Sequence, residues 1–223
     1  MKILLLGAGG FIGVNLAERL LKDGVHEVVA VDIQTEKIQE LLETDLHFRN
    51  LDISKDEAEV EGLVRESDVV VDLVAFANPS LYVEDPIGVF DLNFTQNLKV
   101  VHQCIRHGKR LIQFSTCEVY GITAAKAMGL DSREHPIPFK EDETPLIMGP
   151  VKNQRWIYAC AKQLLERVLH GYGLRGELEW TVIRPFNFIG PRIDFLPSEA
   201  QGNPRVFSHF MNGLLYGTPL KLV

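Results

Sequence analysis

A tyrosine and a lysine four residues apart, Tyr158 and Lys162, are the side chains in this sequence best suited to acid–base chemistry. Their segment has a helical pattern, and on a helix this spacing places both side chains on one face, one turn apart. A phenol with a pKa near ~10 is a poor base at neutral pH, but a neighbouring ammonium stabilises the phenolate and lowers that pKa. We therefore expect Tyr158 to act as a general base with help from Lys162. For an isolated pair of this kind, the alternative is an amphipathic helix with a packed tyrosine and a solvated lysine.

A glycine-rich segment, residues 7–13 (GAGGFIG), stands directly between a predicted strand and a predicted helix. Its glycines permit a tight turn, a close approach of backbone N–H groups to a pyrophosphate, and close packing of the helix on the strand. Asp32 ends the next predicted strand, where its carboxylate can accept hydrogen bonds from the adenosine ribose and would repel the extra phosphate of NADP. The pattern predicts a NAD site; a plain strand–helix turn is the alternative. Its expected cofactor-binding residues are Gly7, Gly10, Phe11, Ile12, Gly13 and Asp32, together with Tyr158 and Lys162.

Two further polar segments follow predicted strands. Asp52 and Ile53 close the third strand, where they are expected either to contact the adenine ring or to cap a helix, and we include both among the cofactor-binding residues. Thr116, Cys117 and Glu118 follow the fifth strand, at the sheet edge that faces the ligand in doubly wound folds. A hydroxyl, a thiol and a carboxylate are costly there unless they meet a partner, so we expect them in the catalytic site. An incidental polar turn is the alternative.

Short aliphatic runs alternate with longer helical patterns along the chain, which is typical of βαβ units and a parallel sheet. The fold class is therefore α/β, a Rossmann-like doubly wound parallel sheet. The proline-rich segment 123–150 fits neither pattern, and long connections of this kind are often functional lids. Strands are expected at 2–6, 27–32, 46–50, 68–73, 110–115, 180–184 and 220–223, and helices at 12–22, 35–43, 55–66, 87–107, 153–172 and 206–215.

The composition excludes several classes of protein. The chain has 223 residues, of which 46% are hydrophobic and 24% charged, as in an ordinary globular protein rather than a disordered one. A net charge of −7 without a basic stripe argues against nucleic-acid binding. The three cysteines and seven histidines show neither a disulfide framework nor metal-ligand spacing, so we expect no metal. The sequence has no apolar run long enough for a membrane span and no clear signal peptide, so a cytoplasmic location is expected.

These motifs together resemble the extended short-chain dehydrogenase/reductase superfamily, the NAD-dependent epimerase/dehydratase family, over essentially the whole chain. The segments 149–158 (GPVKNQRWIY) and 184–192 (RPFNFIGPR) are similar to the UDP-glucuronate decarboxylase domain of the bifunctional polymyxin-resistance enzyme and to plant UDP-apiose/UDP-xylose synthase. The resemblance implies a NAD-binding Rossmann domain with the catalytic residues at 1–185. It implies the start of a nucleotide-sugar-binding region, incomplete in this chain, at 186–223. It also implies a homodimer that pairs through the helices at 87–107 and 153–172.

The resemblance further implies roles for individual residues. Tyr158, assisted by Lys162 and Thr116, would take the proton of the sugar 4-hydroxyl while hydride leaves C4 for NAD. The resulting ketone is β to the C6 carboxylate and makes loss of carbon dioxide easy. Glu118 and Arg155 match positions that handle the substrate carboxylate and the enolate. Asn187 matches a position that holds the UDP diphosphate, and Arg192 one that assists it; Asn93 is expected to be structural.

Two departures from the family narrow the expected reaction. Cys117 stands where sugar-nucleotide 4,6-dehydratases carry an aspartic acid, and a thiol is the weaker acid, so dehydration is disfavoured. Ala77 stands where plant apiose synthase carries a second cysteine tied to ring contraction. The leading hypothesis is an NAD-dependent oxidative decarboxylase of UDP-glucuronate that gives a UDP-4-keto-pentose or UDP-xylose. The alternatives are UDP-apiose synthesis, another UDP-sugar epimerase or dehydratase reaction, and a non-catalytic NAD-binding module.

Overall fold

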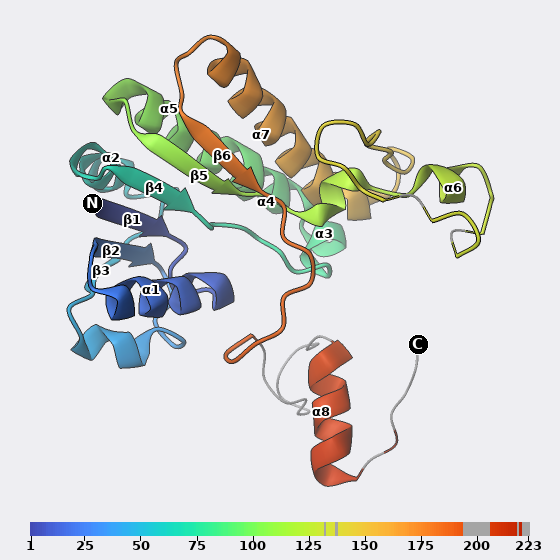
Figure 1. Cartoon of the computed structure of the whole chain (residues 1–223), viewed down its shortest axis with the longest axis horizontal. Coiled ribbons are helices and arrows are strands. Elements are labelled where there is room, and N and C mark those ends of the chain that lie inside the picture. The colour runs from blue at the N-terminus through green and yellow to red at the C-terminus, as the bar shows by residue number, and fades with distance from the viewer. Residues whose placement is uncertain (132, 137, 194–205, 218, 220–223) are drawn as a thin grey trace. The chain divides into compact units, whose positions relative to one another are not determined.

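A computed structural model of the chain describes residues 1–131, 133–136, 138–193, 206–217 and 219. Within these residues six parallel strands form one sheet, in the order β3-β2-β1-β4-β5-β6 (Figure 1). The chain runs outward from β1 in one direction, returns to β4 beside β1, and then runs outward in the other direction. This doubly wound order confirms the predicted fold class, and ligands bind such sheets where the order reverses. The strands are β1 (Lys2–Leu6), β2 (Glu27–Asp32), β3 (His47–Asn50), β4 (Val69–Asp72), β5 (Arg110–Phe114) and β6 (Trp180–Ile183).

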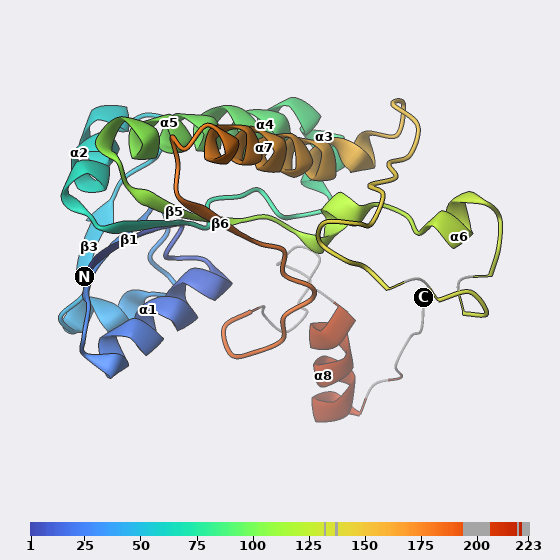
Figure 2. The same cartoon turned by 45° about the horizontal axis from the view of Figure 1, so that its top comes forward.

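Helices cover both faces of the sheet (Figure 2). Helix α1 (Phe11–Asp23) lies on one face, and α2 (Glu57–Glu66), α5 (Asn97–His107) and α7 (Ile157–Leu174) lie on the other. Side chains alternate along each strand, so Leu5 and Val28 pack in the core beside α1, whereas their neighbours Leu4 and Val29 pack in the core of the other face. Strands buried on both faces require the nearly continuous apolar runs that the sequence shows.

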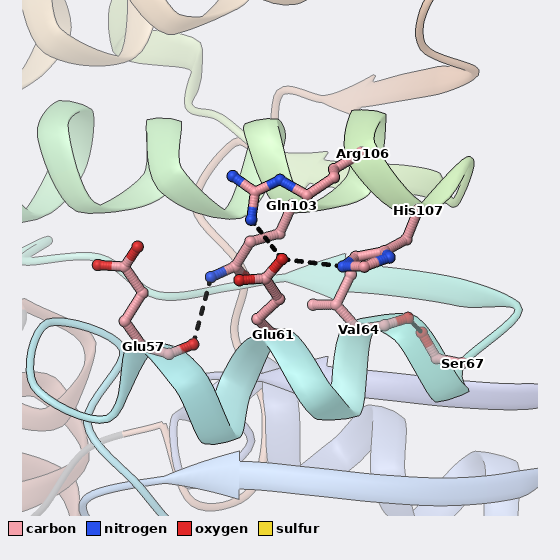
Figure 3. Close-up of polar contacts among 7 residues, drawn as sticks. All are labelled: Glu57, Glu61, Val64, Ser67, Gln103, Arg106 and His107. Carbon is pink, nitrogen blue, oxygen red and sulfur yellow. Dashed lines mark hydrogen bonds and ion pairs between the residues drawn. The ribbon is translucent and has the colours of Figure 1, made fainter.

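Polar contacts join α2 to α5 on the face of the sheet opposite α1. Figure 3 shows Glu61 of α2 paired with both Arg106 and His107 of α5, with 2.9 Å between Glu61 Oε1 and His107 Nε2. Gln103 donates a hydrogen bond to the Glu57 carbonyl oxygen at 3.4 Å. Ion pairs that stay partly exposed, as these do, contribute little stability each, so the apolar packing beneath them holds the two helices together.

The helix expected at 87–107 is confirmed, since the chain is helical without a break from Pro86 to His107, but it contains a π-helical turn that was not expected. Its three parts are α4 (Pro86–Phe90), the π-helical turn η2 (Asp91–Gln96) and α5. Asn93 Nδ2 donates to the Val89 carbonyl oxygen at 2.8 Å, and Asn97 Nδ2 donates to the Leu92 carbonyl oxygen at 2.6 Å. Side-chain amides that bond to helix carbonyls in this way compete with the regular backbone ladder and favour a local bulge.

Other elements differ from the expectation at their ends or in kind. The helix expected at 35–43 is only the 3₁₀ turn η1 (Gln39–Glu43), and α7 is preceded by the 3₁₀ turn η4 (Gln154–Trp156). Segment 123–150 contains the one-turn helix α6 (Ala124–Ala127), and its Ile147 forms an isolated β-bridge with Gly121, just before the segment. The helix expected at 206–215 is confirmed as α8 (Val206–Tyr216), and the strand expected at 220–223 lies outside the described residues.

The chain divides into two compact units, Met1–Phe186 and Asn187–Val223, and α8 belongs to the second. All strands of the sheet, and every helix and turn named above except α8, belong to the first unit. Among the described residues, no helix combines the length and the apolar character that crossing a membrane requires.

Candidate active site

The glycine-rich turn lies at the carboxyl end of β1, next to β4, where the strand order reverses. Gly7 adopts a positive φ of 81°, which favours glycine, and its N–H donates to the Val31 carbonyl oxygen at 2.9 Å. A Cβ on Gly13 would stand 2.4 Å from the Gly7 carbonyl oxygen, so α1 can pack this closely on the turn only with glycine there. Gly10 caps α1 without a side-chain hydrogen bond, which leaves the backbone N–H groups of the first helical turn to bind an anion.

Asp32, at the end of β2, is held against this turn by hydrogen bonds. Its Oδ2 accepts a hydrogen bond from the Gly9 backbone N–H at 2.8 Å, and its Oδ1 accepts one from the Gln34 N–H at 2.9 Å. A Cβ on Gly9 would lie 2.3 Å from the Gln34 carbonyl oxygen and 3.0 Å from Asp32 Cγ. The predicted carboxylate and the predicted turn are thus brought together, with geometry that fits the diphosphate and adenosine ribose of a dinucleotide.

Asp52 and Ile53 have local roles. Asp52 Oδ1 accepts hydrogen bonds from the backbone N–H and the hydroxyl of Ser54, which hold its pKa below the ordinary value, and Lys55 pairs with it at 3.0 Å. Asp56 is the N-cap of α2, so Asp52 holds the turn before this helix and does not cap it, and its contact with the adenine ring stays a prediction. Ile53 is buried in the core on the α2 side of the sheet.

Tyr158 and Lys162 occupy the first turns of α7, and both side chains are buried. The ring of Tyr158 stacks on that of Tyr82, with 4.8 Å between the ring centroids and 11° between the planes. Lys162 Nζ donates to the Phe114 carbonyl oxygen at 3.1 Å, at the end of β5. Burial lowers the pKa of Lys162 to about 8, against the opposing charges of Asp72 and Glu166. The lysine is 1% exposed, so the alternative of a solvated lysine is wrong.

Thr116 and Glu118 lie directly after β5, at the carboxyl end of the sheet. Thr116 caps the short 3₁₀ turn η3 (Cys117–Tyr120), and its Oγ1 accepts a hydrogen bond from the Glu118 N–H at 3.1 Å. Glu118 Oε2 pairs with Arg155 Nη1 at 2.7 Å, and this pairing raises the pKa of the guanidinium. Arg155 comes from η4, immediately before α7, and its guanidinium lies 5.3 Å from the Trp156 ring centroid. The fold thereby joins two predicted residues that are far apart in sequence.

Cys117 stands between these residues and is partly buried. Burial, followed by the charge of Glu118, raises the pKa of its thiol above the ordinary value. The thiol therefore stays protonated at neutral pH and is a poor nucleophile. Among the described residues, no cluster of three or more His, Cys, Asp or Glu side chains could hold a metal ion.

Asn187 and Arg192 belong to the second compact unit and are described within it alone. Arg192 has a positive φ of 68°, unusual for a residue other than glycine, in a turn where the Ile193 N–H donates to the Gly190 carbonyl oxygen at 3.3 Å.

Arg184 and Tyr82 are neighbours of the site that motif analysis did not assign to it. Arg184 forks onto the Glu166 carboxylate at 2.6–3.1 Å, lies 4.9 Å from the Tyr120 ring centroid, and donates to the Glu141 carbonyl oxygen. It thus ties segment 123–150 to α7 and η3. Tyr82 comes from α3 (Leu81–Glu84), a helix of one turn that is too short to show periodicity in sequence.

Comparisons with known proteins agree with this geometry. Residues 3–223 match the model of the NAD dependent epimerase/dehydratase family. The chain is 44% identical over 237 residues to UDP-D-apiose/UDP-D-xylose synthase 1 of Arabidopsis thaliana, an alignment that covers 100% of this chain and 61% of that protein. It is 43% identical over 240 residues to UDP-D-apiose/UDP-D-xylose synthase of Oryza sativa subsp. japonica, with 100% and 59% covered. The chain thus spans about three fifths of the length of these curated relatives.

Solved structures of similar proteins point to the same family. The PbgP3 protein of Burkholderia pseudomallei is 41% identical with a TM-score of 0.79, over 92% of this chain and 64% of that one. The UDP-glucose 4-epimerase of Thermus thermophilus, solved in complex with NAD, is 28% identical with a TM-score of 0.71, over 87% and 58%. The predicted fold, the predicted family and the family's cofactor, NAD, are confirmed: this chain belongs to the NAD dependent epimerase/dehydratase family.

Proposed function

We propose that this chain carries the NAD site and the catalytic residues of an enzyme that oxidises UDP-glucuronate at C4 and decarboxylates it, giving a UDP-4-keto-pentose or UDP-xylose. The observation that carries the proposal is the buried Lys162 one helical turn from Tyr158, at the sheet edge that also holds Thr116. A buried amine with a lowered pKa beside a phenol is costly to keep, and such groups concentrate at catalytic sites. This cost argues against a non-catalytic NAD-binding module.

The glycine turn and Asp32 would hold NAD, which when bound supplies the acceptor for the hydride from C4. The N–H groups at the start of α1 would bind the diphosphate, and the Asp32 carboxylate would accept hydrogen bonds from the adenosine ribose. Both Asp32 oxygens already hold backbone N–H groups, so the carboxylate is oriented before the ligand arrives. Its charge disfavours the additional phosphate of NADP.

Tyr158 takes the proton of the 4-hydroxyl as the hydride leaves. With a pKa of about 8, Lys162 is mostly an ammonium at pH 7, and its charge stabilises the phenolate. Thr116 Oγ1 already accepts a hydrogen bond from the Glu118 N–H, so its own hydroxyl proton is directed to another acceptor, and the sugar oxygen is the one we assign.

Glu118 and Arg155 handle the decarboxylation. The guanidinium of Arg155 is a fork that pairs with carboxylates, and it would orient the C6 carboxylate of the sugar. The bond between C5 and C6 breaks, its electrons enter the 4-ketone as an enolate, and a proton returns to C5. The Glu118–Arg155 pair lies 2.7 Å apart and supplies both a proton carrier and a positive charge for this step.

Three related reactions remain as alternatives within the family. Dehydration is disfavoured because the thiol of Cys117, with its raised pKa, is a poor acid to expel water. The names of the plant relatives support apiose synthesis as well as xylose synthesis, whereas Ala77 argues against ring contraction. The name of the Thermus thermophilus neighbour supports 4-epimerisation.

We also propose that UDP is held by Asn187 and Arg192, and that two copies of the chain pair through the α4–α5 and α7 helices. Ile87 on α4 and Leu164 on α7 are large apolar side chains exposed by 73% and 43%, which a helix-to-helix interface would cover. Replacing Leu164 with glutamate should shift the mass measured by light scattering to that of a monomer. An unchanged mass would contradict the pairing.

The proposed reaction is tested by incubating the protein with NAD and UDP-glucuronate and measuring carbon dioxide and the nucleotide sugars by NMR. We expect carbon dioxide and a UDP-pentose in equal amounts. Glu118→Gln should slow carbon dioxide release more than it slows C4 oxidation, whereas Glu141→Gln, an exposed control, should change neither. A C4 epimer without carbon dioxide would instead establish the epimerase, and no new nucleotide sugar would refute the proposal.

A further inference from the structure

Asp72 is a fully buried carboxylate that the mechanism above does not use. It ends β4, and its Oδ1 accepts a hydrogen bond from the Val74 N–H at 3.0 Å. Its Oδ2 is buried and has no hydrogen-bond partner among the described residues. Buried polar atoms are nearly always paired, and a buried charge is tolerated only near a compensating one. Asp72 therefore requires an electrostatic partner inside the core.

Lys162 is the cation best placed to be that partner. Of the charged side chains in the described part of the chain, Asp72 and Lys162 alone are exposed by 1% or less. Glu166, the next most buried, already receives the fork of Arg184. Lys162 Nζ donates its hydrogen bond to a neutral carbonyl, that of Phe114, so its charge too lacks a salt-bridge partner within the described residues.

The fold places the two groups in the same layer. Asp72 shares a strand face with Val70, which belongs to the same core cluster as residues of α5 and α7. Gln113 on β5 is the register partner of Asp72 and donates to its carbonyl oxygen at 3.4 Å. The next residue, Phe114, accepts the hydrogen bond from Lys162. Asp72 and Lys162 are therefore one strand apart, between the sheet and α7.

We propose that Asp72 is a positioning residue that keeps Lys162 in its ammonium form beneath Tyr158 and thereby sets the pH range in which Tyr158 works as a base. This role rests on the proposed function, because Asp72 would affect the reaction only through Lys162 and Tyr158. Asp72 is 0% exposed, so it would reach neither the substrate nor the cofactor itself.

The electrostatics of the neighbouring groups agree with this geometry. Burial lowers the pKa of Lys162, and the Asp72 carboxylate is the larger of the two charges that oppose the fall. The smaller contribution comes from Glu166 on α7. Burial raises the pKa of Asp72; the charge of Lys162 is the largest influence that opposes the rise, followed by hydrogen bonds from the Val74 N–H and the Gln113 side chain. Cys104 faces Asp72 from α5, but burial and the Asp72 charge raise its pKa to about 12, so it stays neutral.

The test measures the pKa of Lys162 directly, by NMR of the chain labelled with ¹³C-lysine, with the resonance assigned from Lys162→Met. Asp72→Asn keeps the shape and removes the charge, and it should lower the pKa of Lys162 by about one unit or more, the effect of one nearby opposite charge. Asp68→Asn makes the same change at an exposed residue just before β4 and should leave the pKa of Lys162 unchanged. An Asp72→Asn chain whose Lys162 pKa is unchanged would overturn the proposal.

A reciprocal measurement covers the case in which Asp72→Asn fails to fold. Coupling between two titrating groups acts equally on both, so Lys162→Met should raise the pKa of Asp72, followed by the ¹³C resonance of its carboxyl group. An unaltered Asp72 pKa would overturn the proposal in the same way.

A pH profile separates this proposal from the proposed function. With UDP-glucuronate and NAD, Asp72→Asn should move the alkaline limit of turnover to lower pH, a shift that lost packing alone would not cause. If the NMR shifts occur and the wild-type protein shows no turnover, the charge pairing is established and the proposed function is refuted. If turnover occurs without either NMR shift, the role of Asp72 is refuted and the proposed function remains.

Discussion

Because Lys162 loses its buried charge above about pH 8, the free energy of unfolding of the chain should rise with pH in this range. Replacing Lys162 with methionine should remove this rise. Burial lowers its pKa from 10.5 to about 8. Between these two values the unfolded chain binds a proton that the folded chain does not, so the free energy of unfolding increases with pH. The destabilising effect of the buried charge is complete below pH 8 and is relieved as the pH approaches 10.5.

The size of the effect follows from the pKa difference. The full difference, from 10.5 to about 8, is about 2.5 units, which at ~1.4 kcal/mol per unit corresponds to about 3 kcal/mol. Lys162 is 1% exposed, so solvent screening does not reduce this figure substantially. Over the accessible range from about pH 8.5 to about pH 9.5, the expected rise is about 1 kcal/mol.

The assay is urea unfolding at a series of pH values, for the wild-type chain and for Lys162→Met. The difference between their slopes against pH isolates Lys162 from other groups such as Cys104, whose raised pKa acts in the opposite direction at alkaline pH. Lys126→Met, at an exposed position in α6, is the matched control and should keep the wild-type slope. If Lys162→Met also keeps the wild-type slope, the reasoning about the buried amine is refuted.

Three further predictions test individual parts of the site, the second of them with a control substitution. Asp32→Asn should weaken NAD binding by about 10–100-fold, since charge-assisted hydrogen bonds contribute about 1.5–3 kcal/mol. It should also reduce the preference of the protein for NAD over NADP. A fluorescence titration that finds this preference unchanged would contradict the role of Asp32. Gly13→Ala places a Cβ 2.4 Å from a carbonyl oxygen and should destabilise the chain by about 1–3 kcal/mol in thermal unfolding. The control is Gly62→Ala in α2, where a Cβ meets open space, and this change should stabilise the chain by up to about 1 kcal/mol. Arg184→Lys keeps the charge but loses the fork onto Glu166, and should speed limited proteolysis within 123–150; an unchanged rate would contradict that anchoring role.

The sheet could be predicted because its signals are local. The first two strands were expected at 2–6 and 27–32, and they have these bounds in the structure. Strands buried on both faces are continuous apolar runs, and the glycine turn marks where the first one ends. The contact of Asp32 with that turn is a consequence of parallel strands whose carboxyl ends meet at one edge.

The features that sequence analysis missed depend on contacts between distant segments. The π-helical turn inside the helix expected at 87–107 was missed, because the side chains of Asn93 and Asn97 bond to carbonyl groups and periodicity does not reveal which way an amide turns. Asp72 sits within a run of valines and leucines, and only the packed layer above it shows that its carboxylate is buried near Lys162. Tyr82 reaches Tyr158 from a helix of one turn, which leaves no pattern in the sequence.

The central claim is that Tyr158, held beside a buried ammonium, removes the proton of the sugar 4-hydroxyl as the hydride leaves C4. The most direct measurement is the absorbance of NADH after UDP-glucuronate is added to the NAD-loaded protein. Wild-type protein should form NADH in the first turnover, and Tyr158→Phe should lose this signal almost entirely while binding NAD with nearly unchanged affinity. Full NADH formation by Tyr158→Phe would contradict the account, because hydride transfer would then need no phenolic oxygen at that position.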